Sequence, residues 1–391
     1  MSQLSLKQPM INLVLGDQKK RISIVLAIVS LAILFLPSQA KATNESQAAA
    51  LFLLIDPGAR SSGLGKAYTA IANDATGAYY NPAGIAGTKL ICGELYYIKW
   101  LPALVDDVNY SHLSGVLGTN GFLNLGLAAF GLSLSYFDCG EQIRTNEYGE
   151  EEGSFHSYDC ALTATYADNV NRNLSLGASL KFIYSHLADV GAGQERGKGT
   201  GKAFAADIGL LYQGILPTLA FYHRGDVFGT ATQLLAKRMS PGISVGFSLS
   251  NIGPKMSYID ARQADPLPRN VRLGIAYNCL DTDETGLVLA LDLYKPLVND
   301  DPFYKGVLTA WGDESFSDEI DQIDVHIGGE LTLFYVLSLR IGYTSDRDGE
   351  LETSTFGIGL GPETFRFNYS YLPAKDTPLQ DSHRWSLSLS F

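Results

Sequence analysis

The chain has 391 residues, of which 46% are hydrophobic and only 18% are charged. This charged fraction is low beside the roughly 25% of ordinary soluble domains. The net charge of −12 argues against a nucleic-acid partner, because binding phosphates requires clustered Lys and Arg.

The first 42 residues have the pattern of an export signal. A basic stretch at 19–21 precedes an apolar run over 22–36, and Ala40-Lys41-Ala42 fits the small-x-small rule for cleavage. The apolar run is shorter than the 18 or more residues of a spanning helix. We therefore expect cleavage rather than a membrane anchor, with the mature chain starting at Thr43.

The segment 43–89 differs in composition from everything that follows it. Its core, residues 55–87, is rich in Gly, Ala and small polar residues and lacks sustained alternation. Asp74 is expected to cap a short helix over 75–80, which Asn81-Pro82 then ends. We predict that this segment is a plug, and that Asp74, Asn81, Pro82 and Gly84 serve its folding rather than a ligand.

Residues 90–391 alternate apolar and polar side chains, strand after strand. Between 174 and 184, for example, apolar residues alternate with small or polar ones that include Lys181. A full charge in mid-strand suits a wet lumen with lipid on the opposite face. We count about fourteen strands, near 90–100, 108–117, 122–137, 154–167, 174–186, 201–212, 243–251, 269–279, 286–295, 322–333, 335–345, 352–361, 364–372 and 383–391. The predicted fold class is an all-β, transmembrane outer-membrane barrel of about fourteen antiparallel strands with the N-terminal plug inside.

Connection lengths support the same fold. Those after even-numbered strands are mostly tight and those after odd-numbered strands are mostly longer, as expected of periplasmic turns and extracellular loops. Residues 214–242 break this rule, and we expect a periplasmic or a lumenal insertion there.

The last strand is the most specific local signal. Trp385, Leu387, Leu389 and Phe391 fall on every second position and the sequence ends on an aromatic residue. In a soluble edge strand this face would lie in water. The pattern resembles the C-terminal signal that barrel-assembly machinery recognises, so that machinery and outer-membrane lipid are expected partners, and the bacterial outer membrane the expected location.

The chain carries little that resembles catalytic or metal chemistry. A G-x-S-x-G match at 242–246 lies in an alternating strand, whereas a nucleophile elbow needs a strand–turn–helix. We therefore expect no enzyme, no cofactor and no metal. Lumenal charges such as Lys181, Arg272, Asp292, Glu330 and Arg340 form either a conduction path or, as we favour, a polar interior whose groups satisfy one another.

Cys139 and Cys160 flank the loop centred on Gly149-Glu150 at equal distances. A simple hairpin register would place them opposite each other, and the export route permits disulfides. A bridge across this loop and two unrelated free thiols both remain open.

Several segments together resemble a known family. They include Pro57-Gly58-Ala59-Arg60 and Tyr80-Asn81-Pro82-Ala83-Gly84 in the plug, the run Ser250-Asn251-Ile252-Gly253-Pro254-Lys255, and Leu267-Pro268-Arg269-Asn270. These motifs are similar to those of the PorV/PorQ family, within the wider FadL-like class of plugged outer-membrane barrels.

The resemblance implies a fourteen-stranded plugged barrel with a role in type IX secretion. Such a barrel docks beside a larger translocon barrel, receives exported cargo proteins by their C-terminal domains and hands them to a surface attachment complex. From the residues, loops 252–268 and 296–321 are the expected partner-facing surfaces, with Asn251, Gly253, Pro254 and Lys255 as candidates. The alternative is a FadL-like transporter of hydrophobic small molecules.

Overall fold

The computed structural model describes residues 47–88, 91–102, 105–120, 127–146, 148–189, 199–215, 242–258, 263–282, 284–349, 351–362, 364–374 and 381–391. The predicted export signal and nearly all of the 214–242 insertion lie outside these residues.

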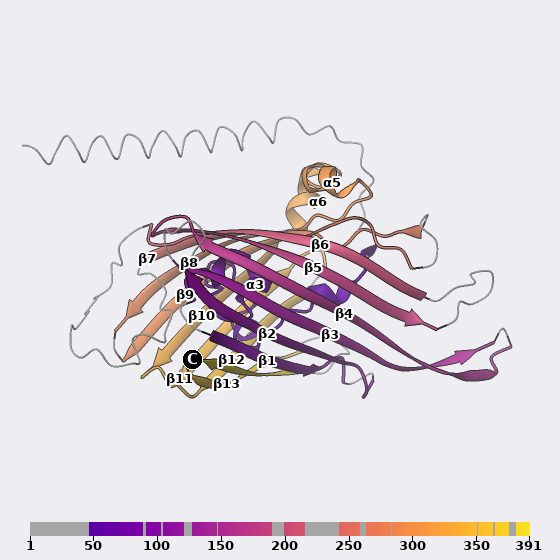
Figure 1. The fold of residues 1–391 in the computed structure, drawn as a ribbon, viewed down its shortest axis with the longest axis horizontal. Helices are drawn as coiled ribbons and strands as arrows, with labels where there is room; N and C mark the ends of the chain where they lie inside the picture. The colour runs from indigo at the N-terminus through magenta and orange to yellow at the C-terminus, as the bar shows by residue number, and fades with distance from the viewer. Residues whose placement is uncertain are drawn as a thin grey trace, which may run out of the picture.

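Fourteen antiparallel strands form one closed barrel in which each strand pairs with its neighbours in sequence and β14 pairs with β1 (Figure 1). The predicted fold class is confirmed. The strands are β1 Ile91–Lys99, β2 Asn109–Asn120, β3 Leu127–Thr145, β4 Glu151–Asn169, β5 Leu174–Ala188, β6 Gly199–Tyr212, β7 Gly242–Ile252, β8 Asn270–Asp281, β9 Thr285–Pro296, β10 Asp324–Leu333, β11 Leu337–Asp346, β12 Leu351–Leu360, β13 Phe365–Leu372 and β14 Ser382–Ser390. Among the described residues, no helix is long and apolar enough to span a membrane.

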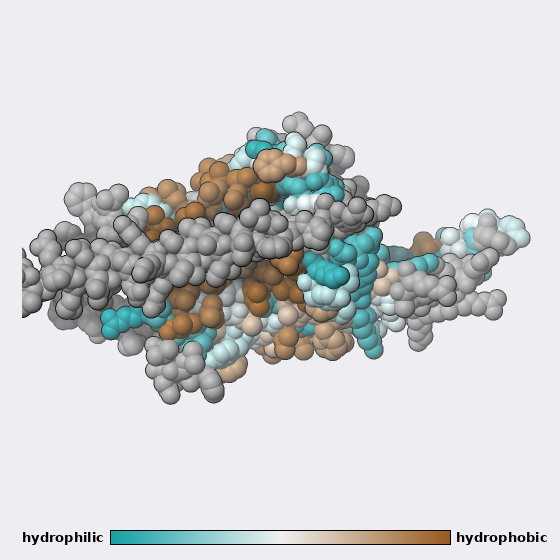
Figure 2. Space-filling model, turned by 90° about the horizontal axis from the view of Figure 1, so that it is seen from above, coloured by the Kyte–Doolittle hydropathy of each residue, from teal (hydrophilic) through white to brown (hydrophobic). Residues whose placement is uncertain are grey.

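The alternation within strands separates a lipid face from a lumenal face. On β5 the side chain of Leu180 is 70% exposed while the adjacent Lys181 is buried inside. Figure 2 shows brown, apolar atoms over the middle of the barrel and teal, polar atoms toward its ends. An apolar band around a polar interior is the arrangement of a membrane barrel.

The β3–β4 hairpin is longer than predicted. The stretch 138–153, expected to be a loop, consists mostly of strand, and the two strands extend beyond the rest of the barrel (Figure 1). Asn146 sets the turn, because its Oδ1 accepts hydrogen bonds from the backbone N–H groups of Tyr148 and Glu150, both 2.9 Å long.

This turn changes the register on which the disulfide hypothesis rested. Cys160 lies opposite Tyr136, and Cys139 falls in a register shift between Asp138 and Glu141. The expectation that the two cysteines face each other is therefore wrong, because the turn lies nearer Asn146 than we assumed. Both are free thiols.

The plug lies in the lumen and consists of short helical pieces (Figure 1). They are η2 Leu51–Leu54, α2 Ala59–Gly63, α3 Gly77–Tyr80 and η3 Pro82–Ile85. The α2 helix contacts β11 to β14, whereas η3 contacts β3 to β6. The plug therefore touches opposite parts of the wall.

Glycines on the lumenal face of the wall give the plug backbone its space. A β-carbon at Gly209 would lie 2.2 Å from Oδ1 of Asn81, and one at Gly328 would lie 2.4 Å from the carbonyl oxygen of Leu64. Neither position can hold a side chain without moving the plug. The sequence of the wall is thus fitted to the plug as well as to lipid.

Gly328 and the adjacent Gly329 offer a matched test. Gly328→Ala should destabilise the folded barrel by about 1–3 kcal/mol through overpacking against the plug. Gly329→Ala should have little effect, because its β-carbon would meet its nearest neighbour, on Leu289, at an ordinary 3.4 Å. Denaturant titration of both variants in lipid vesicles measures the difference, and equal stabilities would contradict this packing.

Candidate functional site

The candidate site is the interface between the plug and the barrel wall, and its centre is a partly buried cluster around Arg60. From α2, Arg60 donates Nε and Nη2 to the two carboxylate oxygens of Glu330 on β10, at 2.9 and 2.7 Å. Glu330 also accepts from Nε of Arg340 on β11, at 2.6 Å. A bidentate pair of this kind fixes direction as well as distance.

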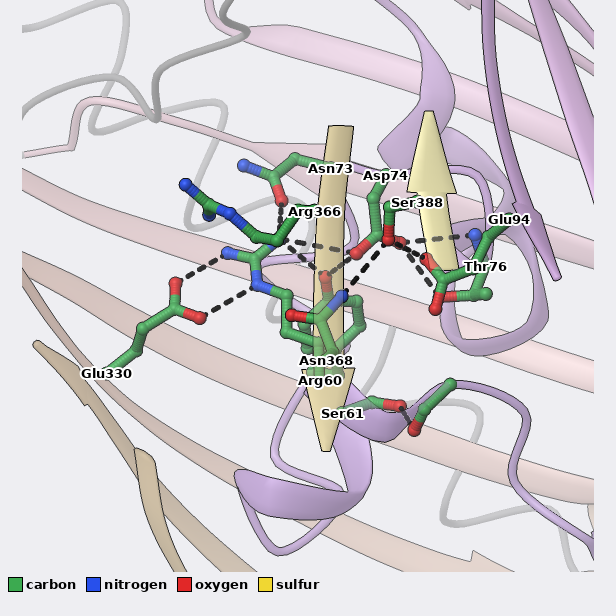
Figure 3. A network of polar contacts seen from close by, with 12 residues as sticks. Arg60, Ser61, Asn73, Asp74, Thr76, Glu94, Glu330, Arg366, Asn368 and Ser388 are labelled. Carbon is green, nitrogen blue, oxygen red and sulfur yellow. Dashed lines mark hydrogen bonds and ion pairs between the residues drawn. The ribbon is translucent and has the colours of Figure 1, made fainter. Parts of the chain in front are cut away.

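The same arginine organises the plug itself. Figure 3 shows Arg60 between Glu330 on one side and Asn73 and Asp74 on the other. Its Nη1 donates to Oδ1 of Asn73 at 2.8 Å and to Asp74 at 3.3 Å. Asp74 further accepts a hydrogen bond from the Tyr68 hydroxyl. One guanidinium therefore joins two turns of the plug to the wall.

Asp74 does not cap a helix over 75–80 as predicted. The α3 helix begins only at Gly77. Asp74 Oδ1 instead accepts from the backbone N–H of Thr76 at 3.1 Å and from its hydroxyl at 2.8 Å. This local turn competes with a longer helix, as Asp side chains commonly do.

A second charged contact ties the plug to the closing strand. Asp56 accepts from Nη1 of Arg384 on β14 at 2.8 Å and from the hydroxyl of Ser62 at 2.6 Å. Burial alone would raise the pKa of Asp56, but the charges of Arg384 and Lys66 and the Ser62 hydrogen bond lower it to about 2. Asp56 is therefore an anion at neutral pH.

Asn81 and Asp292 hold further parts of the plug through hydrogen bonds to backbone groups. Asn81 accepts from the N–H of Ala83 at 3.1 Å and donates to the carbonyls of Thr69 and Leu210, at 2.9 and 3.0 Å. Asp292 on β9 accepts from the backbone N–H groups of Tyr68 and Thr69, at 2.8 and 2.7 Å. Gly84 is packed so closely that a β-carbon there would lie 2.2 Å from the carbonyl oxygen of Ala72.

Arg272 on β8 adds a further contact between the plug and the wall, through aromatic rings. Its guanidinium carbon lies 5.2 Å from the ring centre of Tyr80 in the plug and 4.7 Å from that of Tyr294 on the wall. Cation–π contacts of this kind gain strength when they are shielded from water. Most of the lumenal charged side chains predicted from the sequence therefore contact the plug or a residue that holds it.

A small cavity with a mixed apolar and polar lining lies between the plug and strands β2 to β6. It has a volume of about 30 Å³ and is lined by, among others, Tyr79, His112, Lys181 and Asp207. That volume suits about one water molecule. Lys181 pairs with Asp207 at 3.0 Å, so the charges beside the cavity are also bound.

The partner-loop candidates divide into two groups. Asn251 is buried and accepts from Nζ of Lys181 at 2.5 Å, and its own N–H donates to Asp207 at 2.8 Å. Gly253 is also buried, whereas Pro254 and Lys255 are exposed. Only the latter two are placed where a partner could reach them.

Sequence reasoning missed the roles of Asp56, Arg60 and Arg384. The available signal was weak: Asp56 and Arg60 stand in an otherwise small and apolar segment, and Arg384 alternates with the apolar face of the last strand. Charges in such positions have to be paired when they are buried. Among the described residues, no group of His, Cys, Asp and Glu is arranged to hold a metal ion.

A closed antiparallel barrel with an apolar belt and a plug bonded into its lumen defines a bacterial outer-membrane barrel. The family model described as "Type IX secretion system protein PorV" matches residues 38–302. The chain belongs to this PorV family and is a protein of the bacterial outer membrane. No curated protein matches the sequence.

Solved structures of similar shape include two outer-membrane proteins of Pseudomonas. The chain is 13% identical to the Pseudomonas putida toluene transporter TodX, with a TM-score of 0.46 and with 85% of this chain and 96% of that chain covered. For a Pseudomonas aeruginosa FadL homologue the values are 12% identity, a TM-score of 0.44 and coverage of 86% and 98%.

Removing the carboxylate charge at the centre of the Arg60 cluster tests its contribution. Glu330→Gln should lower the free energy of unfolding by about 3–5 kcal/mol, because the buried guanidinium of Arg340 loses its anion and Arg60 keeps only Asp74, at 3.3 Å. Glu152→Gln, which removes the anion of an exposed pair with Arg144, should cost no more than about 1 kcal/mol. Denaturation in lipid vesicles gives both values, and a mild Glu330→Gln effect would count against the cluster.

The lowered pKa of Asp56 predicts how the free energy of unfolding depends on pH. Its folded pKa of about 2 lies below the unfolded value near 3.9, so its contribution is present above about pH 4 and is lost as the pH falls toward 2. The stability difference between the wild type and Asp56→Asn should therefore shrink by about 2 kcal/mol from about pH 5 to about pH 2. A constant difference over this range would contradict the Asp56–Arg384 account.

Proposed function

We propose that this barrel is a non-enzymatic component of type IX protein secretion that binds exported proteins at its outer loops and passes them toward the cell surface. Family membership supports a place in that system. The observation that carries the proposal is the fixed plug. The ion pairs Arg60–Glu330 and Asp56–Arg384 bind it to β10 and β14, so a task at the loops fits better than one in the lumen.

The structure of the outer end supports a binding role. By the rule that short turns are periplasmic, the connections after odd-numbered strands are extracellular. These connections include the projecting β3–β4 hairpin and the β9–β10 loop, which carries two helices (Figure 1). They offer a structured surface to a protein partner. A larger translocon barrel would sit beside this surface.

The alternative is transport of hydrophobic small molecules through the barrel. An apolar ligand needs an apolar route, yet the cavity beside the plug measures only about 30 Å³ and has the ion pair of Lys181 and Asp207 in its lining. The contacts of the plug therefore favour the secretion role.

Crosslinking in the native outer membrane tests the proposal. A tagged copy of the chain should recover a larger translocon barrel together with exported proteins that share a C-terminal domain, as identified by mass spectrometry. An unrelated tagged outer-membrane barrel at matched abundance is the control. Recovery of the tagged chain alone, with a small apolar molecule retained inside it, would contradict the secretion role and support transport.

A further inference from the structure

Two short helices in the β9–β10 connection form a compact projection on the barrel. They are α5 Phe303–Thr309 and α6 Phe316–Asp321, and Figure 1 shows them in orange beyond the barrel wall. We call residues 297–322 the α5–α6 unit. It lies on the extracellular side, because it follows an odd-numbered strand.

Buried contacts fix the base of the α5–α6 unit to the wall. Arg269, which is 1% exposed, donates Nη2 to the backbone oxygen of Asn299 at 3.0 Å and to its Oδ1 at 3.2 Å. Leu297 and Ala310 are buried in one apolar cluster with Leu249 of β7. The first helix is thereby held against the ends of β7 and β8.

A second anchor holds the other helix. Nζ of Lys295, at the end of β9, lies 2.8 Å from Glu319 of α6 and donates to Gln322 at 2.7 Å. The Lys295 side chain is 3% exposed and that of Glu319 is 10% exposed. A buried, doubly bonded ammonium is costly to pull apart, so the α5–α6 unit is held in one orientation before any partner arrives.

Six large apolar side chains of this unit are in contact with solvent. Together they form what we call the apolar patch: Phe303, Tyr304, Leu308, Trp311, Phe316 and Ile320, with exposed fractions of 39%, 65%, 55%, 45%, 82% and 40%. Single exposed apolar residues are ordinary, but a group of them on a rigid surface marks an interaction site. Aromatic residues are also enriched among the residues that dominate binding energy.

The charge around the apolar patch indicates what covers it. The α5–α6 unit contains seven acidic residues and one lysine. Three of the acids pair with cations outside the unit, Asp300 with Lys255, Glu319 with Lys295 and Asp321 with Arg347, and the four that remain still exceed the single lysine. Such a surface repels the phosphates of a lipid headgroup layer, and it repels a second copy of itself. It attracts a protein segment that combines apolar side chains with Lys or Arg.

We propose that the apolar patch is the docking surface for an apolar, Lys- or Arg-bearing segment of an exported protein. This inference rests on the proposed function and adds to it the site and the chemistry of the bound segment. The acidic residues steer the segment, and the aromatic side chains supply the buried area.

The test compares two variants of the full chain in its own cells. Leu308→Ser with Phe316→Ser removes two side chains of the apolar patch, and Phe334→Ser removes an exposed aromatic residue, 70% exposed, from the β10–β11 turn at the periplasmic end. Both should keep the heat-dependent gel mobility of a folded barrel. Recovery of exported proteins should fall at least about tenfold for the double variant, because two hot-spot side chains are lost, and should stay at the wild-type level for Phe334→Ser.

The outcomes separate this inference from the function on which it rests. If the wild type recovers no exported protein, the proposed function fails and the docking surface with it. If the wild type and the double variant recover equal amounts, the function stands and the docking surface is wrong.

A photoreactive amino acid at position 316 identifies the occupant directly. Adducts with exported proteins that weaken as NaCl rises from about 0.05 M to about 0.5 M support the inference, because salt screens exposed charges. Adducts confined to lipopolysaccharide, or to a second copy of the chain, overturn it.

Discussion

The plug and the barrel are held together by ion pairs buried in the lumen. Asp56, Arg384, Glu330 and Arg340 are all buried, and the side chain of Arg60, which pairs with Glu330, is 18% exposed. A buried charge is tolerable only when its partner is in place. The plug therefore needs β10, β11 and β14 to be paired, and those strands need the plug, so that folding of the one part depends on the other.

The closing strand shows how one element can serve two tasks. The outward side chains of β14 include Trp385, which is 44% exposed, while the adjacent Arg384 points inward to Asp56. Alternation along a strand makes this division possible. The strand that resembles an assembly signal on its lipid face thus also fastens the plug on its lumenal face.

The sequence predicted the parts that local pattern determines. In strands with a lipid face, apolar side chains recur at every second residue. The irregular segment around Asn81-Pro82 lacks that alternation, so the barrel and the plug could both be recognised from the sequence. Register was harder. Asn146 moved the turn of the β3–β4 hairpin and separated Cys139 from Cys160, and a side chain that bonds to nearby backbone leaves little trace in a spacing count.

Long-range pairs and burial were beyond one sequence. Arg60 and Glu330 are 270 residues apart, and the sequence around either residue does not predict that the two form an ion pair. Asn251 resembled an exposed loop residue because it lies near Gly and Pro, yet it is 2% exposed and bonded to Lys181. Its position follows from the closed barrel, which no local motif describes.

The central claim is that the plug stays in place while the barrel works, and a reversible covalent lock tests it most directly. A β-carbon at position 63 would lie 3.5 Å from that of Arg340, within the range of a disulfide. Gly63→Cys with Arg340→Cys, with the four native cysteines replaced by alanine, removes Arg340 from the Glu330 cluster in both redox states, so the reduced variant is the reference. This variant should recover exported proteins as well after oxidation as before it. Loss of recovery on oxidation, restored by reduction, would show that the plug has to move and would contradict the account.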